Sequence, residues 1–288
     1  MNCVPWASDV RHNRCVSYLE ENRASWDDRA QAHAESGGYH VADFIADPSY
    51  LSEVVQFDRP RLGDLTGLAG IHLQCHIGTD TISLARLGAR MTGLDFSERS
   101  LEMARDISIR CGTSVDFVRG ELYEAPEVLG RQYDFVFTGI GALCWLPDIA
   151  GWAAVVRRLL KPSGRLLLRE GHPMLWALDE ERDDGLLVVH HPYFETIEPE
   201  TEETSETYVE TDAVLKLGRW HSWNHGLGEV MSALMNEGFT IRLFEEHRSV
   251  PWNALPGHMV VGADGEWRLE ADADRLPLTY TLHADLPG

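Results

Sequence analysis

The stretch from Gly70 to Ser97 constrains the fold more than any other part of this 288-residue chain. It reads GIHLQCHIGTDTISLARLGARMTGLDFS: an apolar run enters a short turn near Gly78, a helical pattern follows, and a second apolar run ends on Asp95. That order predicts a strand, a tight turn, a helix and a second strand with a carboxylate at its tip. In an open parallel sheet the ligand lies beyond the carboxyl ends of the strands, where an acid suits the hydroxyls of a ribose. The stretch therefore predicts a cofactor that contains adenosine.

Strand and helix patterns continue to alternate along the middle of the chain. Strands are expected at 70–75, 90–95, 115–118, 133–138 and 164–170, with helices at 79–88, 97–111 and 149–160. The last helix is closed by Lys161-Pro162-Ser163-Gly164, a helix-stopping sequence. Alternation of this kind predicts an α/β fold with a doubly wound, mostly parallel sheet. A helix near 226–237 and strands at 240–245 and 278–283 would complete seven strands, with an Ala-Asp-Gly turn at 263–265.

The pattern divides the chain into three regions. Residues 1–65 are mainly helical and amphipathic, and we expect them to form a helical lid over the cofactor. Residues 66–175 form the expected cofactor-binding core. Residues 176–288 would hold a cap insertion, at about 176–225, and then the closing helix and strands of the core. The acid-rich stretch 195–212 is predicted to be a solvated strand or loop.

Composition excludes several classes of partner. A net charge of −21 argues against nucleic acid as a ligand, because phosphate binding rests on Lys and Arg. No apolar run of transmembrane length and no secretory signal is found, so we expect no membrane partner. The five cysteines are widely spaced and form no CxxC pair, which suits reduced thiols in a cytoplasmic protein. We expect a monomer or homodimer that acts on a small molecule.

The order of elements and the residues at their tips resemble a class I S-adenosylmethionine-dependent methyltransferase over roughly residues 20–285. The glycine-rich motif of that family is here HLQCHIG, with His72 in place of an acid and Gln74 and His76 in place of glycines. Only Gly78 remains. Such a loss would disable a nicotinamide-dependent oxidoreductase, in which glycine lets the backbone approach a pyrophosphate. S-adenosylmethionine has no phosphate, so the departure favours the methyltransferase.

Three later segments also resemble one bacterial branch of that class, which acts on small natural products. They are LCWLPD at 143–148, EGHPMLW at 170–176 and SWNHGLGE at 222–229. The resemblance implies a Rossmann-like fold, S-adenosyl-L-methionine as cofactor, and methyl transfer to a small acceptor in secondary metabolism.

The resemblance also implies the cofactor contacts. Asp95 would bind the ribose hydroxyls with Phe96 beside the adenine, Glu121 would accept from the adenine amino group, and Thr138 would lie beside the methionine part. Asp95 could instead cap the next helix, although Ser97 is the better cap, and Glu121 could be an exposed loop residue. The full expected set is Gln74, His76, Gly78, Thr79, Asp95, Phe96, Ser97, Glu121, Leu122 and Thr138.

Three residues are candidates for a general base: His172, His225 and Tyr39. An imidazole titrates near neutral pH and can accept a proton, or it can brace a loop through hydrogen bonds. Trp26, Trp145 and Trp223 are expected to line the substrate pocket or to pack in the core. His221, His225 and Glu229 share the spacing of a metal-binding helix face. Gly226 and Gly228 disfavour a regular helix there, so we expect no metal.

The sequence thus predicts methyl transfer to a nitrogen, oxygen or carbon of a small aromatic or heterocyclic metabolite, for example of the indole type. Two alternatives stay open. One is a catalytically inactive protein that binds the cofactor as a scaffold module, suggested by the altered HLQCHIG motif. The other is a nicotinamide-dependent oxidoreductase.

Overall fold

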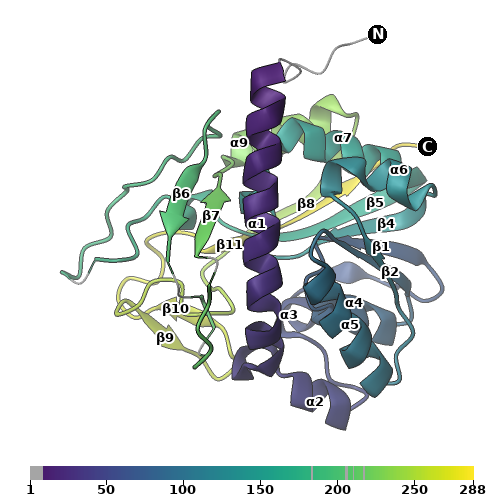
Figure 1. The fold of residues 1–288 in the computed structure, drawn as a ribbon, viewed down its shortest axis with the longest axis horizontal. Coiled ribbons are helices and arrows are strands. Elements are labelled where there is room, and N and C mark those ends of the chain that lie inside the picture. Colours follow the sequence, from purple (N-terminus) through teal and green to yellow (C-terminus); the bar gives the residue numbers. More distant parts are fainter. Residues whose placement is uncertain (1–8, 183, 205–206, 210, 217) are drawn as a thin grey trace.

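The computed structural model describes residues 9–182, 184–204, 207–209, 211–216 and 218–288, with side chains described from Ser17 onward. Its centre is a seven-stranded sheet (Figure 1). In spatial order the strands are β3 (Asp116–Arg119), β2 (Arg90–Asp95), β1 (Ala69–Leu73), β4 (Tyr133–Thr138), β5 (Leu160–Gly171), β11 (Thr279–Asp285) and β8 (Thr240–His247). The other six strands of this sheet run in one direction, and β11 runs opposite to them. The predicted seven-stranded, mostly parallel Rossmann-like sheet is confirmed.

Helices cover both faces of the sheet. The apolar side chains of α6 (Ala125–Leu129), α7 (Ile149–Leu159) and α9 (Leu227–Asn236) pack on one face against alternate residues of β1, β4 and β5. The other face is covered by α3 (Glu53–Leu62), α4 (Thr79–Arg86) and α5 (Glu98–Arg110). The fully buried Trp152 of α7 lies at the centre of the larger core. Because both faces are buried, the strands are nearly continuous apolar runs in the sequence.

The long helix α1 (Asp9–Glu35) crosses the front of the molecule, as the purple ribbon in Figure 1 shows. It packs against α5 on one side and against β7 (Arg219–Ser222) on the other. The Asn22 side chain fixes the second contact: it donates to the His221 carbonyl and accepts from the His221 amide, both at 2.8 Å. After α1 the chain forms the short helices η1 (Gly37–Tyr39) and α2 (Val41–Ala46) before α3 begins.

Three strand ends lie side by side in one row of the sheet. Thr279, which begins β11, pairs with Gly171 at the end of β5 and with His247 at the end of β8. From this row the chain leaves as two insertions. The first, after β5, contains α8 (Pro173–Trp176) and the hairpin of β6 (Glu200–Glu203) with β7. The second, between β8 and β11, contains the hairpin of β9 (Met259–Val261) with β10 (Trp267–Leu269).

The sequence pattern predicts only the first of these insertions. For the second insertion it predicts a plain connection with a turn at 263–265, whereas that turn joins β9 to β10. Both hairpins lie on the left in Figure 1. The helix-stopping sequence also differs from the expectation: α7 ends at Leu159, close to the predicted end, but residues 161–164 belong to β5. Ser163 takes a left-handed conformation, φ 63°, and the register of β5 against β4 shifts there.

Candidate active site

The turn after β1 holds three residues in the left-handed backbone conformation. They are Gln74 (φ 56°), His76 (φ 49°) and Gly78 (φ 79°). For a residue with a side chain this conformation costs about 1–2 kcal/mol. At Gly78 a side chain is also excluded by space, because a Cβ there would lie 2.8 Å from the ring of Phe117. The turn therefore has the backbone conformation that glycines favour, although two of the three positions carry large side chains.

Asp95 at the tip of β2 is held against this turn. Its Oδ2 accepts from the His76 amide at 2.8 Å, and its Oδ1 accepts from the Ser97 amide at 2.9 Å. Burial raises the pKa of Asp95 to about 6, and these two hydrogen bonds oppose the rise. Ser97, not Asp95, caps α5, since its hydroxyl accepts from the Ser100 amide at 3.0 Å. The hydrogen bonds from His76 and Ser97 thus fix the orientation of the Asp95 carboxylate at the tip of β2. The next residue, Phe96, is half-buried.

Glu121 follows β3 and begins the short helix η2 (Leu122–Glu124). Its Oε2 accepts from the Tyr123 amide at 2.6 Å. Glu121 is half-buried, so it is not the exposed loop residue of the alternative interpretation, and this burial raises its pKa to about 7. Leu122 points into the core and is buried, as is Thr79 at the start of α4.

Two buried polar atoms near these strand tips have no hydrogen-bond partner within the described residues. One is the hydroxyl of Thr138, at the end of β4. The other is Oε1 of Gln74, whose Nε2 donates to the Ala142 carbonyl at 3.0 Å. Buried polar groups are nearly always paired, so these two atoms leave hydrogen-bonding capacity at this turn that a polar ligand could fill.

Aromatic side chains from the N-terminal helices cover the turn. The Trp26 ring lies 4.9 Å from the His76 ring, and the Tyr39 ring lies 5.5 Å from it. His33 joins them: its Nδ1 is 2.9 Å from Nε2 of His76, and its ring stacks on Tyr39. Burial lowers the pKa of His33 to about 3, so this ring is neutral at physiological pH. The hydroxyl of Tyr39 is hydrogen-bonded to that of Tyr208.

His33 is absent from the residues that the sequence analysis singled out. Its spacing of seven residues from Trp26 places the two on one face of α1 and could have indicated the pair. Trp145, in η3 (Leu143–Trp145), extends the same cluster, with ring centres 5.1 Å from Trp26 and 5.4 Å from Trp220. Trp223 is not part of this aromatic cluster. It is buried beside a second group of residues, and its amide donates to the Cys144 carbonyl.

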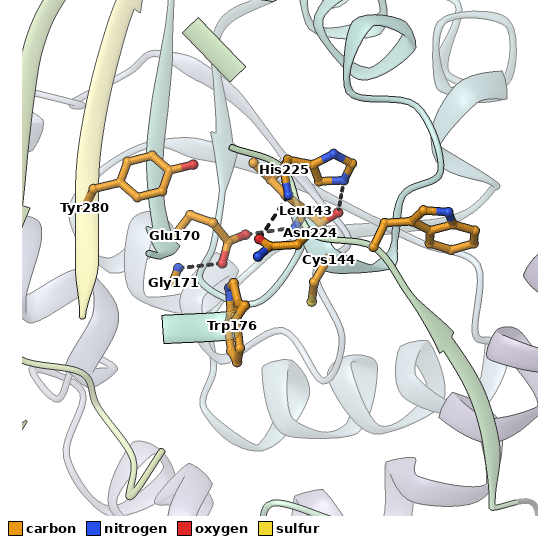
Figure 2. A pocket seen from close by; sticks show the side chains of 9 residues that line it. Leu143, Cys144, Glu170, Gly171, Trp176, Asn224, His225 and Tyr280 are labelled. Carbon is orange, nitrogen blue, oxygen red and sulfur yellow. Dashed lines mark hydrogen bonds between the residues drawn. The ribbon is translucent and has the colours of Figure 1, made fainter. Parts of the chain in front are cut away.

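That second group lines a small cavity of about 10 Å³, enough for one water (Figure 2). Glu170 near the end of β5 organises it. Its carboxylate accepts from the amides of Gly141, Ala142, Leu143 and Gly171, at 2.5 to 2.9 Å. Glu170 thereby fixes the loop after β4, which carries Trp145. The sequence signal for it is the same as for Asp95, an acid at a strand tip, but the prediction favoured the nearby His172.

His225 lies in this second group and supports the same loop. Its Nε2 lies 3.0 and 2.9 Å from the carbonyl oxygens of Leu143 and Leu146 and donates to them. Its Nδ1 lies 3.0 Å from a carboxylate oxygen of Glu195. Nδ1 makes no hydrogen bond within the described residues, so His225 holds the loop through Nε2. The metal-binding face does not form, because His221 belongs to β7 and α9 begins only at Leu227.

His172 caps the short helix α8. Its Nδ1 accepts from the Met174 amide at 3.0 Å, and its Nε2 lies 3.0 Å from an oxygen of Glu246. Burial lowers the pKa of His172, while Glu246 opposes that shift. Tyr39, His172 and His225 therefore belong to three different sets of contacts. Of the three, only Tyr39 contacts the turn after β1.

Comparison with known proteins agrees with this geometry. Residues 71–166 match a family model described as "Methyltransferase domain". A demethylmenaquinone methyltransferase of Lactococcus lactis is 35% identical over 120 residues, which are 40% of this chain and 47% of that protein. The chain thus spans about half the length of this curated relative.

Solved structures share the fold. An S-adenosylmethionine-dependent methyltransferase from Mesorhizobium loti aligns over 81% of this chain and 98% of its own, with a TM-score of 0.53 and 19% identity. A glycopeptide N-methyltransferase complexed with S-adenosyl-L-methionine covers 83% and 96%, with a TM-score of 0.51 and 18% identity. The chain carries a methyltransferase domain, and its sheet is that of the class I S-adenosylmethionine-dependent methyltransferases, as the resemblance in sequence implied.

The described residues contain neither a candidate membrane span nor a candidate metal site. Among the helices that the structure describes, none is both long and apolar enough to cross a bilayer. No set of three or more His, Cys, Asp or Glu side chains in the described ranges is arranged to hold a metal ion.

Proposed function

We propose that this protein is an S-adenosylmethionine-dependent methyltransferase that acts on a small aromatic or heterocyclic molecule. The observation that carries the proposal is the set of groups around the turn after β1. The carboxylate of Asp95 is hydrogen-bonded to the turn, and Oε1 of Gln74 in the turn and the hydroxyl of Thr138 at the tip of β4 are unpaired among the described residues. A ribose needs an acceptor for its hydroxyls, and the methionine part of the cofactor carries an ammonium group that can donate to such oxygens. Asp95 therefore fits the ribose of the cofactor, and Gln74 and Thr138 fit its methionine part.

When bound, the cofactor supplies an electrophilic methyl group on a sulfonium, which an acceptor atom displaces in line. The protein's own residues hold and orient the reactants and exclude water from the site. Asp95 and Glu121 would bind the adenosine, while Gln74 and Thr138 would bind the methionine part. Trp26, His33 and Tyr39 form an aromatic cover over His76. Holding two reactants in line can lower the barrier by about 7–11 kcal/mol.

Among the three candidate bases, we assign the role to Tyr39. The ring nitrogens of His172 and His225 are occupied by hydrogen bonds to the backbone and by nearby carboxylates, whereas Tyr39 contacts the turn directly. Burial raises the pKa of Tyr39 well above its usual value, so its phenol would relay a proton and not hold a charge. A carbon nucleophile needs no base before attack, and Tyr39 would then only position the acceptor.

The tryptophans support an aromatic substrate, because pockets for such molecules are lined by aromatic side chains. Trp26 and Trp145 lie beside the cofactor turn, and Trp223 lies in the second group of residues. The relatives named for demethylmenaquinone and for a glycopeptide also favour an acceptor other than nucleic acid. We further propose that residues 1–65 act as the lid of the site.

Calorimetry with S-adenosylmethionine and S-adenosylhomocysteine tests the cofactor. We expect both to bind and Asp95→Ala to weaken both by at least about tenfold, the loss of one charged hydrogen bond. Asp106→Ala is the control, because it removes an exposed carboxylate of α5 that is paired with Arg110. Binding of NAD in place of both adenosyl ligands would favour the oxidoreductase.

Methyl transfer is tested with methyl-labelled cofactor and a panel of indoles, phenols and amines. Label in any of them excludes the inactive scaffold, whereas binding without transfer to any metabolite of a bacterial lysate supports it. Tyr39→Phe should lower kcat, and His172→Ala should change kcat less. Full turnover in Tyr39→Phe would remove Tyr39 from the reaction without affecting the methyltransferase assignment.

A further inference from the structure

Arg29, on α1, is a buried cation with no counter-ion among the described residues. The residue is 5% exposed, and its Nε is buried without a hydrogen-bond partner within the described part of the chain. The nearby Tyr208, Asp28 and Glu202 act on its charge electrostatically. A guanidinium carries five donors and stays protonated in proteins, so leaving it buried and unpaired costs free energy. Such a group is retained where a ligand provides the missing acceptor.

Aromatic rings surround this guanidinium. Its central carbon lies 6.0 Å from the centre of the Trp26 ring and 5.8 Å from that of Trp220. Both rings contact Trp145, so the three indoles and Arg29 form one continuous group, which we call the Trp–Arg group. A second donor in it is also unpaired: Nε1 of Trp220 is buried and has no acceptor among the described residues. The Trp–Arg group thus offers flat apolar surfaces and two donors that lack an acceptor there.

The Trp–Arg group adjoins the cofactor turn on the side of the methionine part. Trp26 contacts His76, and Trp145 follows the loop whose Ala142 carbonyl accepts from Gln74. Asp95, assigned to the ribose, also accepts from the His76 amide, whereas Glu121, assigned to the adenine, bonds to the Tyr123 amide. A molecule bound at the Trp–Arg group would therefore lie next to the cofactor turn.

Resting on the proposed function, we propose that the substrate is a planar aromatic molecule with a negatively charged oxygen group, a carboxylate or an ionised phenol, and that Arg29 binds this group. The indole rings would stack on the aromatic part, and Nε1 of Trp220 would donate to the same anion. A buried cation is required because the chain as a whole carries a charge of −21 and repels anions. Arg29 thereby selects acidic substrates over neutral molecules of the same shape.

The test uses paired probes that differ only in charge: indole-3-acetate against indole-3-acetamide, and 4-hydroxybenzoate against 4-hydroxybenzamide. Each is titrated by calorimetry into protein saturated with S-adenosylhomocysteine and into protein without it. A hydrogen bond between charged groups strengthens binding substantially, so the carboxylates should bind roughly 10- to 100-fold more tightly than the amides. Arg29→Gln should remove this preference, and Arg29→Lys should keep part of it.

Two further variants serve as references. Arg23→Gln removes a partly exposed cation of the same helix, paired with Asp27 at 3.0 Å, and should leave the preference intact. Trp220→Phe keeps an aromatic ring and removes the Nε1 donor, so it should weaken carboxylate binding more than amide binding. It also tests the proposal independently if Arg29→Gln fails to fold.

The proposal is overturned if no carboxylate binds at millimolar concentrations, if the amides bind equally well, or if Arg29→Gln keeps the preference. It is also overturned if Arg29→Gln weakens S-adenosylhomocysteine as strongly as Asp95→Ala does, because Arg29 would then bind the carboxylate of the cofactor. Failure of the proposed function has a different signature: no adenosyl ligand binds at all, whatever the probes do.

Discussion

At Gln74 and His76 the backbone takes a conformation that favours glycine, while each side chain has a specific contact. The Gln74 amide donates to the Ala142 carbonyl, and His76 lies against His33 and Trp26. The two side chains therefore join the turn to the loop after β4 and to α1, which glycines could not do. The strain of the left-handed conformation is offset by these contacts and by the neighbouring strands.

Two substitutions at Gln74 separate strain from contact. Gln74→Ala and Gln74→Gly both remove the hydrogen bond to Ala142, but only glycine relieves the left-handed conformation. We expect the glycine variant to be more stable than the alanine variant by about 1 kcal/mol, measured by urea unfolding. The same pair at Ile71, in the middle of β1, should give the opposite order, since glycine weakens a strand. An alanine variant as stable as the glycine variant would contradict a strained turn.

If Glu121 binds the adenine as proposed, its raised pKa of about 7 makes cofactor binding depend on pH. The ionised carboxylate would accept from the adenine amino group, so affinity for S-adenosylhomocysteine should increase as the pH rises through the pKa. The sign for stability is the reverse: the protonated buried acid contributes its full stability to the free protein below its ordinary pKa of 4.5, and this contribution is lost as the pH rises through about 7.

Calorimetry at several pH values on either side of the pKa of Glu121 measures the effect on binding. Glu121→Gln keeps an oxygen for the Tyr123 amide and removes the titration, so its affinity should vary much less over this range. Glu124→Gln removes a carboxylate from the same short helix and should leave the pH dependence in place. Equal pH profiles for the wild type and Glu121→Gln would remove Glu121 from the adenine site.

At the scale of elements, periodicity predicted most of the sheet and part of the site. The bounds of β2 and β4 agree with the expected strands, and α4, α5, α7 and α9 differ from the expected helices by at most two residues at either end. These elements are buried on one side or both, so their apolar pattern is strong. The hairpin of β9 and β10 was missed because its strands are three residues long, too short for a period to appear.

The positions of the candidate site residues could be predicted from the sequence where the strand order determines them. They could not be predicted where they depend on how helices pack. Asp95 and Thr138 end strands and Glu121 follows one, and parallel strands bring their ends to one edge. The positions of His33 and Arg29 depend on how α1 packs on that edge. No local pattern gives that packing, because it is set by contacts between residues far apart in sequence.

A buried ion pair joins the second insertion to the sheet. Nη2 of Arg169, on β5, lies 3.2 and 3.0 Å from the two carboxylate oxygens of Glu266, in the turn before β10. The guanidinium also lies 3.7 Å from the centre of the Phe57 ring of α3. Arg169 has no exposed surface, so it depends on Glu266 for its charge balance.

Glu266→Gln should therefore destabilise the protein by about 3 kcal/mol, because it leaves a buried cation without its partner. Chemical unfolding measures this difference. Asp264→Asn breaks an exposed pair with Arg268 in the same hairpin and should cost less than about 1 kcal/mol. Similar losses in the two variants would show that the hairpin is not anchored through Arg169.

At the scale of the whole molecule, negative charge is in large excess: 46 acidic residues against 25 basic ones. Acidic side chains therefore outnumber the cations that could pair with them, and the molecule repels itself at low ionic strength. The β6 strand, Glu200–Glu203, is an example, with three acids among four residues.

Added salt should therefore stabilise this protein. Raising sodium chloride from about 0.01 M to 0.15 M shortens the Debye length from about 30 to 8 Å and screens this repulsion. We expect the thermal midpoint to rise by a few degrees, which corresponds to about 1 kcal/mol. Sucrose at the same osmolality controls for general solute effects. A midpoint that falls with salt would mean that attractive ion pairs outweigh the net repulsion.

The row formed by Gly171, Thr279 and His247 determines which segments of the gene can vary without changing the sheet. Both insertions leave the sheet at this row, so an insertion, deletion or recombination within 172–226 or 248–278 alters no residue of β5, β8 or β11. Genes for such chains can exchange these segments while the sheet and the residues at the tips of β1, β2 and β4 are inherited unchanged. The hairpins of the two insertions and the strand tips of the sheet can then vary independently within one gene.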